Sequence, residues 1–111
     1  MEFDKVAMAK KVLVLIISNA GLGLRFARRA KEFMKDVKVA LWAEGEDHVA
    51  SGWVDDRLKE VIDSGIEVVA CRKQAEGRGY EKALRRKKVK LVSVSEYVSK
   101  AILEGREVLT F

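Results

Sequence analysis

Short apolar runs alternate with amphipathic stretches along most of the chain, and this alternation is the feature that most limits its fold. The apolar runs occupy residues 12–17, 37–43, 66–71, 90–94 and 107–111. The first contains no polar residue, which is typical of a strand buried on both faces of a parallel sheet. Strands that alternate with helices form a parallel sheet covered by those helices. The sequence therefore predicts a doubly wound α/β domain with five parallel strands and four main helices.

The stretches between the apolar runs carry helical periodicity. Phe26, Ala30, Phe33 and Met34 follow i, i+4, i+7 and i+8 spacing. Further helices are predicted at residues 54–65, at residues 74–86, and from Ser93 or Ser95 to a stop at Gly105. Loops are predicted at residues 18–23 and 44–53. Residues 1–10 form a leader without a clear period, so the domain is predicted over residues 11–111.

Composition limits the environment and the chemistry. The chain has 111 residues, one cysteine and one histidine. One cysteine cannot form an internal disulfide, and one Cys with one His cannot build a structural zinc site within one chain. The longest apolar run is too short to span a bilayer, and the N-terminus lacks a signal-peptide pattern. We expect a cytoplasmic protein that binds neither membrane nor metal and uses no cofactor.

Cys71 lies where an apolar run ends and a basic, helical stretch begins. The carboxyl ends of parallel strands are where open α/β sheets bind their ligands. The partial positive charge of a helix start, together with Arg72, Lys73 and Arg78, favours thiolate over thiol. Cys71 is the predicted reactive centre, although a lone cysteine can equally be a small buried hydrophobe without chemistry.

Other strand ends bring polar residues to the same edge of the predicted sheet. Asn19 follows the first strand, Glu44 and His48 follow the second, and Ser93 and Ser95 follow the fourth. His48 is a candidate base, and Glu44 and its neighbour Asp47 are candidates to orient a substrate. Solvated loop positions without a special role are the alternative for His48, Glu44 and Asp47, and a serine would need an adjacent base.

The glycine pair Gly21 and Gly23 resembles part of a dinucleotide fingerprint, and Glu44 stands near the position of a ribose-binding acid. The third glycine is missing, because Phe26 or Ala27 occupies that region. A glycine pair at a strand-to-helix turn can also serve the turn itself. A module that binds a nucleotide or small anion through residues 21–23 is therefore an alternative function.

The net charge of +5 could indicate an anionic partner. The strongest basic cluster is residues 85–88 with Lys90. No aromatic side chains are interleaved with it, so the stacking platform of single-strand binders is absent. We expect no specific nucleic-acid binding, and a solvated helix end is the preferred interpretation of the cluster.

Residues 68–79, Val-Val-Ala-Cys-Arg-Lys-Gln-Ala-Glu-Gly-Arg-Gly, resemble the cysteine signature of DsrE/DsrF-like proteins, the sulfur-relay group that includes the Tus carriers. In that signature a strand ends in cysteine, and a helix with a small residue and Arg-Gly follows. The first strand with its Asn19 loop, and the Ser93 helix with the final strand, look similar too. The resemblance covers roughly residues 11–111.

This resemblance implies a three-layer α/β/α sandwich on a five-stranded parallel sheet, in a dimer, trimer or hexamer. It also implies that Cys71 accepts sulfane sulfur as a persulfide and exchanges it with donor and acceptor proteins. Some members have a second cysteine three residues after the first, but position 74 is Gln, so no local resolving thiol exists. Trp53, a large aromatic next to Gly52 in a predicted loop, is hard to bury within one chain and also favours a homo-oligomer. The alternative is a structural subunit with an inert cysteine.

Overall fold

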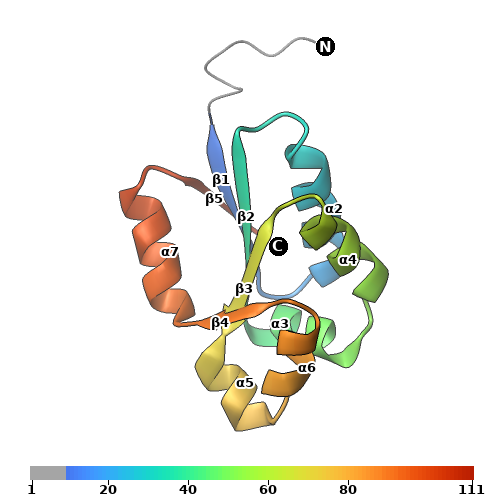
Figure 1. The fold of residues 1–111 in the computed structure, drawn as a ribbon. Helices are drawn as coiled ribbons and strands as arrows, with labels where there is room; N and C mark the ends of the chain where they lie inside the picture. The colour runs from blue at the N-terminus through green and yellow to red at the C-terminus, as the bar shows by residue number, and fades with distance from the viewer. Residues whose placement is uncertain (1–9) are drawn as a thin grey trace.

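A five-stranded parallel sheet organises the computed structural model, which describes residues 10–111. The predicted leader lies outside the described residues, apart from Lys10. The strand order is β4-β3-β2-β1-β5, so β2 is the middle strand and β4 and β5 are the edges. The strands are β1 (Lys11–Ile16), β2 (Asp36–Leu41), β3 (Glu67–Cys71), β4 (Lys90–Val92) and β5 (Glu107–Thr110) (Figure 1). The predicted α/β class and the five parallel strands are confirmed.

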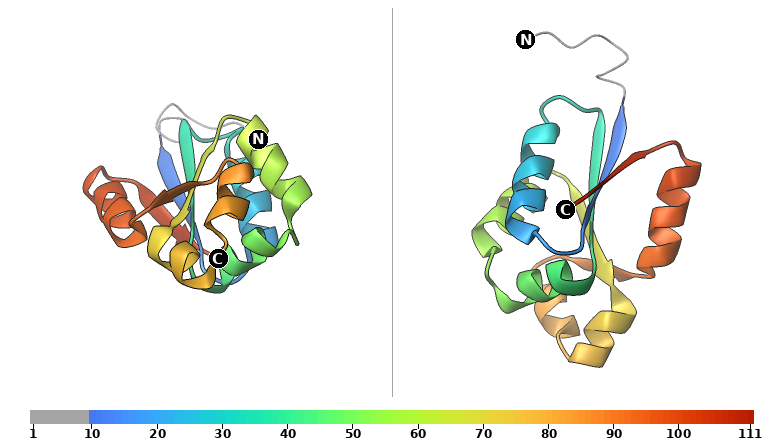
Figure 2. Two further views of the ribbon diagram at one scale, coloured as in Figure 1. Left: turned by 60° about the horizontal axis from the view of Figure 1, so that its bottom comes forward. Right: turned by 180° about the vertical axis from the view of Figure 1, so that it is seen from behind.

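The order of the strands decides which face each helix covers. The first three crossovers run in one direction across the sheet, and the fourth returns from β4 to β5 at the opposite edge. Because parallel crossovers are right-handed, the reversal sends the last helix to the other face. Figure 2 shows α7 (Val94–Leu103) alone on one side, with α2 (Ala20–Ala30) and α4 (Asp55–Asp63) on the other. Three layers result.

The two faces of the sheet bury cores of different size. The larger core includes Val14, Val39 and Val68 from the strands, with Leu24 and Leu58 from α2 and α4. The smaller core, beneath α7, has the buried residues Leu13, Ala40, Val69 and Ala101. Alternate residues of each central strand point to opposite faces, so both faces of β1, β2 and β3 are apolar.

Three local predictions are wrong. The segment predicted as the loop 44–53 contains helix α3 (Ala43–Ser51). Helix α2 begins at Ala20, so the predicted loop 18–23 is mostly helical. The predicted helix 74–86 is two helices, α5 (Arg72–Arg78) and α6 (Glu81–Arg86), because Gly79 ends α5 in the left-handed conformation with φ of 75°.

Gly45 lies inside α3, although a glycine usually argues against a helix. A Cβ at this position would lie 2.5 Å from the Ile16 carbonyl oxygen. The glycine therefore allows α3 to contact the end of β1, and it does not break the helix.

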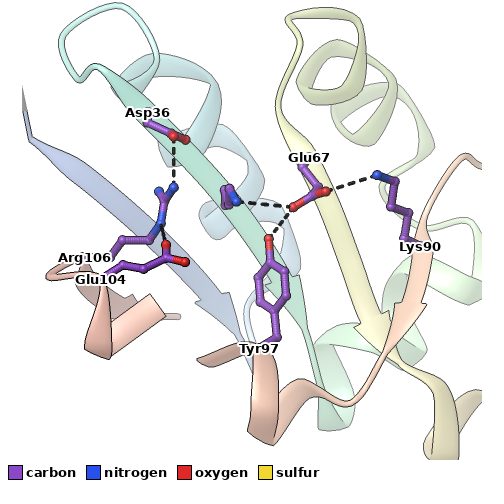
Figure 3. Close-up of polar contacts among 7 residues, drawn as sticks. Asp36, Glu67, Lys90, Tyr97, Glu104 and Arg106 are labelled. Atoms are coloured by element: carbon purple, nitrogen blue, oxygen red, sulfur yellow. Dashed lines mark hydrogen bonds and ion pairs between the residues drawn. The ribbon is translucent and has the colours of Figure 1, made fainter. Parts of the chain in front are cut away.

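A polar cluster fastens α7 and the start of β5 to the amino-terminal ends of the strands (Figure 3). The Tyr97 hydroxyl donates to Glu67 at 2.6 Å, and Lys90 pairs with the same carboxylate at 3.1 Å. Arg106 Nη2 donates to Asp36 at 2.9 Å. The Arg106 side chain is only 3% exposed, so Asp36 compensates a charge that is removed from water.

Candidate functional site

A surface pocket of about 930 Å³ lies at the carboxyl edge of the sheet and contains Cys71. Figure 1 shows α3, α5 and α6 gathered at this end, toward which the strands run. We call it the Cys71 pocket. Its lining comes from the end of β2, from β3 with α5, and from β4 with the start of α7: Trp42, Cys71, Arg72, Lys73, Gln74, Glu76, Gly77, Arg78, Val92, Ser93, Val94 and Ser95.

Strand register places the cysteine beside the start of α7. Cys71 is the last residue of β3 and pairs with Val92, the last residue of β4. Ser93 follows and caps α7, accepting a hydrogen bond from the Glu96 amide at 3.4 Å. The N-terminus of this ten-residue helix therefore faces the pocket. Its partial positive charge favours an anion there.

The three predicted cations all line the pocket, but they differ in what else they contact. Arg72 Nη2 donates to the Leu91 carbonyl at 2.9 Å, which ties α5 to β4. Arg78 forms an ion pair with Asp47 of α3. Within residues 10–111, Lys73 has no hydrogen bond or ion pair and is exposed. Lys73 is thus the cation with its charge available to a bound anion.

A buried carboxyl group, Glu46, supports the backbone of the cysteine. Glu46 lies on α3, is 0% exposed, and its Oε1 accepts the Cys71 amide hydrogen at 2.6 Å. Its Oε2 is buried and has no hydrogen-bond partner among the described residues. Burial raises the pKa of Glu46 to about 7, against the lowering effect of the Cys71 hydrogen bond.

Gln74 fixes the position of α3 relative to α5. Its Oε1 accepts from the Ala43 amide at 2.9 Å, and its Nε2 donates to the Ala43 carbonyl at 2.8 Å. Ala43 has a φ of 50°, which a residue with a Cβ rarely adopts. This double hydrogen bond supports the strained turn into α3. Gln74 thus has a structural role at the position where some DsrE-like proteins have cysteine.

Asp47 connects the same elements. It accepts hydrogen bonds from Tyr80 at 2.8 Å and from Gln74 at 3.1 Å, in addition to its pair with Arg78. Burial opposes ionisation, but these donors keep the pKa of Asp47 below its usual value. The Asp47 carboxylate is thus a permanent anchor that joins α3 to α5 and to the segment before α6.

Five of the predicted pocket residues lie outside the Cys71 pocket: Asn19, Gly21, Gly23, Glu44 and His48. Asn19 caps α2, and its side chain accepts from the Leu22 amide at 3.0 Å. A Cβ on Gly23 would lie 2.6 Å from Ile16 Cγ1, so close packing of α2 on β1 accounts for this glycine. His48 stacks on Trp53, with ring centroids 4.7 Å apart.

The basic cluster near residue 85 is partly neutralised. Lys87 pairs with Asp55 at 2.6 Å, and Lys90 pairs with Glu67 at 3.1 Å. These pairs join α6 to α4 and β4 to β3, which agrees with a structural role for the cluster.

The sequence did not indicate the roles of Trp42 and Glu46. Trp42 lines the pocket directly after β2 and is 37% exposed. Glu46 stands three residues before the buried Val49, so helical spacing places both on the inner face of α3. That spacing is the available signal, and it was missed because the segment was predicted to be a loop.

The fold and the pocket together define a small α/β protein with a single thiol at the carboxyl edge of a parallel sheet. The sequence matches no known family model and no curated protein. Solved structures do match the fold. The protein of unknown function MTH1491 from Methanobacterium thermoautotrophicum has a TM-score of 0.79 and 15% identity, covering 92% of this chain and 99% of that one.

Two further structures cover this chain almost completely. The conserved protein of unknown function BT1422 from Bacteroides thetaiotaomicron has a TM-score of 0.75 and 18% identity, covering 97% of this chain and 100% of that chain. The ychN protein from E. coli has a TM-score of 0.67 and 20% identity, covering 94% of this chain and 100% of its own. At these identities the likeness shows a shared fold.

Residues 10–111 contain neither a membrane-spanning helix nor a cluster of possible metal ligands. No helix there is long and apolar enough to cross a membrane. No three His, Cys, Asp or Glu side chains in that range are grouped in a way that could hold a metal ion.

Proposed function

We propose that this protein is a small sulfur carrier of the DsrE-like type, in which Cys71 accepts sulfane sulfur and passes it on. The observation that carries the proposal is the position of the thiol. Cys71 is partly exposed in a pocket that also contains the unpaired cation Lys73 and the N-terminus of α7. The resemblance of residues 68–79 to the DsrE/DsrF cysteine signature supports the same chemistry.

Sulfur transfer through one cysteine needs two displacement steps. In the first, the Cys71 thiolate attacks the outer sulfur of a donor persulfide, a sulfur–sulfur bond forms, and the donor leaves as a thiolate. In the second, an acceptor thiolate attacks the outer sulfur of the Cys71 persulfide, and Cys71 leaves as a thiolate. No oxidant or reductant is consumed, and no second cysteine is required.

The surroundings of Cys71 suit the anions in both steps. Lys73 is the cation proposed to interact with the attacking thiolate and with the persulfide anion. Arg72 and Arg78 also line the pocket, but Arg72 donates to the Leu91 carbonyl and Arg78 forms an ion pair with Asp47. The proposed partners are donor and acceptor proteins whose reactive thiols enter the pocket, and the proposed compartment is the cytoplasm.

Incubation with a persulfide donor tests the proposal. Intact mass measurement should show the gain of one sulfur atom, and dithiothreitol should remove it. Cys71→Ser should abolish the gain. Because Cys71 is the only cysteine, no other thiol can produce the same signal. A thiol that reacts only after unfolding would contradict the proposal and favour a structural subunit with an inert cysteine.

Substitution of Lys73 tests the role of the pocket cation. Lys73→Gln should slow sulfur uptake by about threefold through loss of one screened charge. Lys82→Gln is the matched control, because Lys82 is exposed on α6 and lies outside the pocket. Equal rates for the two variants would assign no role to Lys73.

A further inference from the structure

The backbone amide of Cys71 donates its hydrogen bond to a side chain, at a position where a longer β2 would supply a backbone carbonyl. Strand β2 pairs with β3 only as far as the Leu41–Ala70 pair, and the chain then turns into α3. On its other side Cys71 remains paired with Val92 of β4. Glu46 supplies the acceptor that β2 no longer offers, because its Oε1 lies 2.6 Å from the Cys71 nitrogen.

The carboxyl group that fills this position is incompletely satisfied. Glu46 is 0% exposed, and its Oε2 has no hydrogen-bond partner within residues 10–111. A buried oxygen without a donor costs less when the carboxyl group is neutral than when it is charged. The first turn of α3 favours an acid, but the inner side of the helix does not, because the other buried residues there are Gly45 and Val49.

The charged and titratable groups around Glu46 come from four places. Asp47 is its neighbour on α3, Arg78 projects from α5, Tyr80 lies between α5 and α6, and Cys71 ends β3. The nearby Tyr80 hydroxyl lowers the pKa of Glu46, the negative charge of Asp47 raises it, and the positive charge of Arg78 lowers it. Helices α2 and α6 also contact α3, and their buried residues are all apolar or glycine.

We propose that Glu46 is a positioning residue for Cys71, and that the charge of its carboxyl group controls the reactivity of the thiol. This inference rests on Cys71 being the reactive centre of the proposed function. The amide nitrogen and the sulfur of one cysteine are three bonds apart, so the carboxyl group lies close to the thiol. A neutral Glu46 leaves the thiolate undisturbed, whereas a charged Glu46 repels it.

The pKa of Glu46 supports this proposal, because it lies in a pH range where the reactivity of the thiol can be measured. Burial raises the pKa of Glu46 to about 7, so the group changes charge close to neutrality. Below this range the Cys71 amide donates its hydrogen bond to a neutral carboxyl group. Above it the same acceptor carries a negative charge, and both the thiolate and a persulfide anion on Cys71 are disfavoured.

Alkylation by iodoacetamide, measured against pH, tests the inference. Glu46→Gln keeps the side-chain size and an oxygen acceptor for the Cys71 amide but removes the charge. The variant and the wild type should react at equal rates near pH 5.5, and the variant should react about tenfold faster near pH 8. Glu60→Gln is the control for net charge, because Glu60 is exposed on α4.

A rate ratio that stays constant with pH would overturn the inference, because a purely structural role would change the rate equally at every pH. If Glu46→Gln does not fold, carbon-13 NMR of glutamate-labelled wild-type protein replaces it. The Glu46 carboxyl resonance should titrate near neutrality. Titration together with the exposed glutamates would also overturn the inference.

This experiment is separate from the test of sulfur transfer. Iodoacetamide is uncharged and requires only a thiolate, whereas sulfur uptake requires a persulfide donor. A pH-dependent rate ratio without sulfur uptake would support the role of Glu46 and contradict the carrier function. Sulfur uptake with a constant ratio would do the reverse.

Discussion

Among single residues, Glu46 differs from the other perturbed acids in the direction of its shift. The pKa values of Asp36, Asp47 and Glu67 are lowered, whereas burial raises the pKa of Glu46 to about 7. A raised folded-state pKa means that the folded protein binds the proton more tightly than the unfolded chain. The free energy of unfolding should therefore fall as the pH rises from about 4.5 to about 7, by roughly 3 kcal/mol at most.

Glu46→Gln should remove this part of the pH dependence. Urea unfolding near pH 5.5 and near pH 8 should give similar free energies for the variant, whereas the wild type should be less stable near pH 8. The control Glu60→Gln should retain the wild-type difference, because Glu60 is exposed. A variant with the same pH dependence as the wild type would show that Glu46 titrates normally.

Two glycines should respond oppositely to the same substitution. A Cβ on Gly23 would lie 2.6 Å from Ile16 Cγ1, and Ile16 is fully buried, so Gly23→Ala should cost about 2 kcal/mol. Gly77 lies inside α5 with no atom within 4 Å of its Cβ position, so Gly77→Ala should gain roughly 0.5–1 kcal/mol. Thermal unfolding measures both, and shifts of the same sign would contradict the close packing of α2 on β1.

At the scale of elements, the Asp36–Arg106 pair joins β2 to the start of β5. Asp36→Asn would leave Arg106 with its partner weakened, and its side chain is only 3% exposed. Because Asp36 is itself partly exposed, the expected loss is about 2 kcal/mol, less than for a fully buried pair. Asp63→Asn is the control, since Asp63 forms an exposed pair with Lys59 and its loss should leave the stability nearly unchanged.

The Asp36–Arg106 pair also makes the stability of the fold depend on pH in the acid range. The Arg106 hydrogen bond is the main cause of the lowered pKa of Asp36, with burial opposing it. A depressed folded-state pKa stabilises the protein above the unfolded value near 3.8, and this contribution is lost as the pH falls through the folded value. Asp36→Asn should therefore flatten the acid limb of the stability profile.

The elements show what the sequence could and could not predict. The inner strands β1, β2 and β3 were predictable because both faces of the sheet are covered there, which makes these strands mostly apolar. Helix α3 was not predictable, because Gly45 argues against a helix in the sequence. The reason for a glycine inside this helix is its close contact with β1, which is distant in the chain. The break between α5 and α6 was not predictable either. A glycine can lie within a helix or end it, and only the left-handed φ of Gly79 shows that it ends α5.

The candidate site divides in the same way. Cys71 and its basic neighbours lie in one short segment, so the end of an apolar run was enough to suggest them. Glu46 becomes important only because β2 ends before β3 does, and this difference in strand length cannot be seen in either segment alone. Five predicted residues lie outside the pocket. All strand ends do share one edge of the sheet, but this edge is wider than a single site.

For the whole molecule, we predict a homo-oligomer. Several large apolar side chains remain exposed, including Trp53 at 76% and Leu103 at 86%. A domain of this size also has a large surface relative to its core. Light scattering at micromolar concentration should give a multiple of the 12.5 kDa chain mass. Leu103→Lys and Trp53→Ser should identify the face involved, and a wild-type mass of one chain would refute the prediction.

The unequal covering of the sheet has a consequence for how the molecule opens. Among residues 10–111, helix α7 rests on a core with four buried residues, whereas α2 and α4 share the much larger one. Amide protons of α7 should therefore exchange with solvent through local unfolding at a lower free energy than those of α2. Since Ser93, Val94 and Ser95 line one side of the Cys71 pocket, local unfolding of α7 would open the pocket on that side.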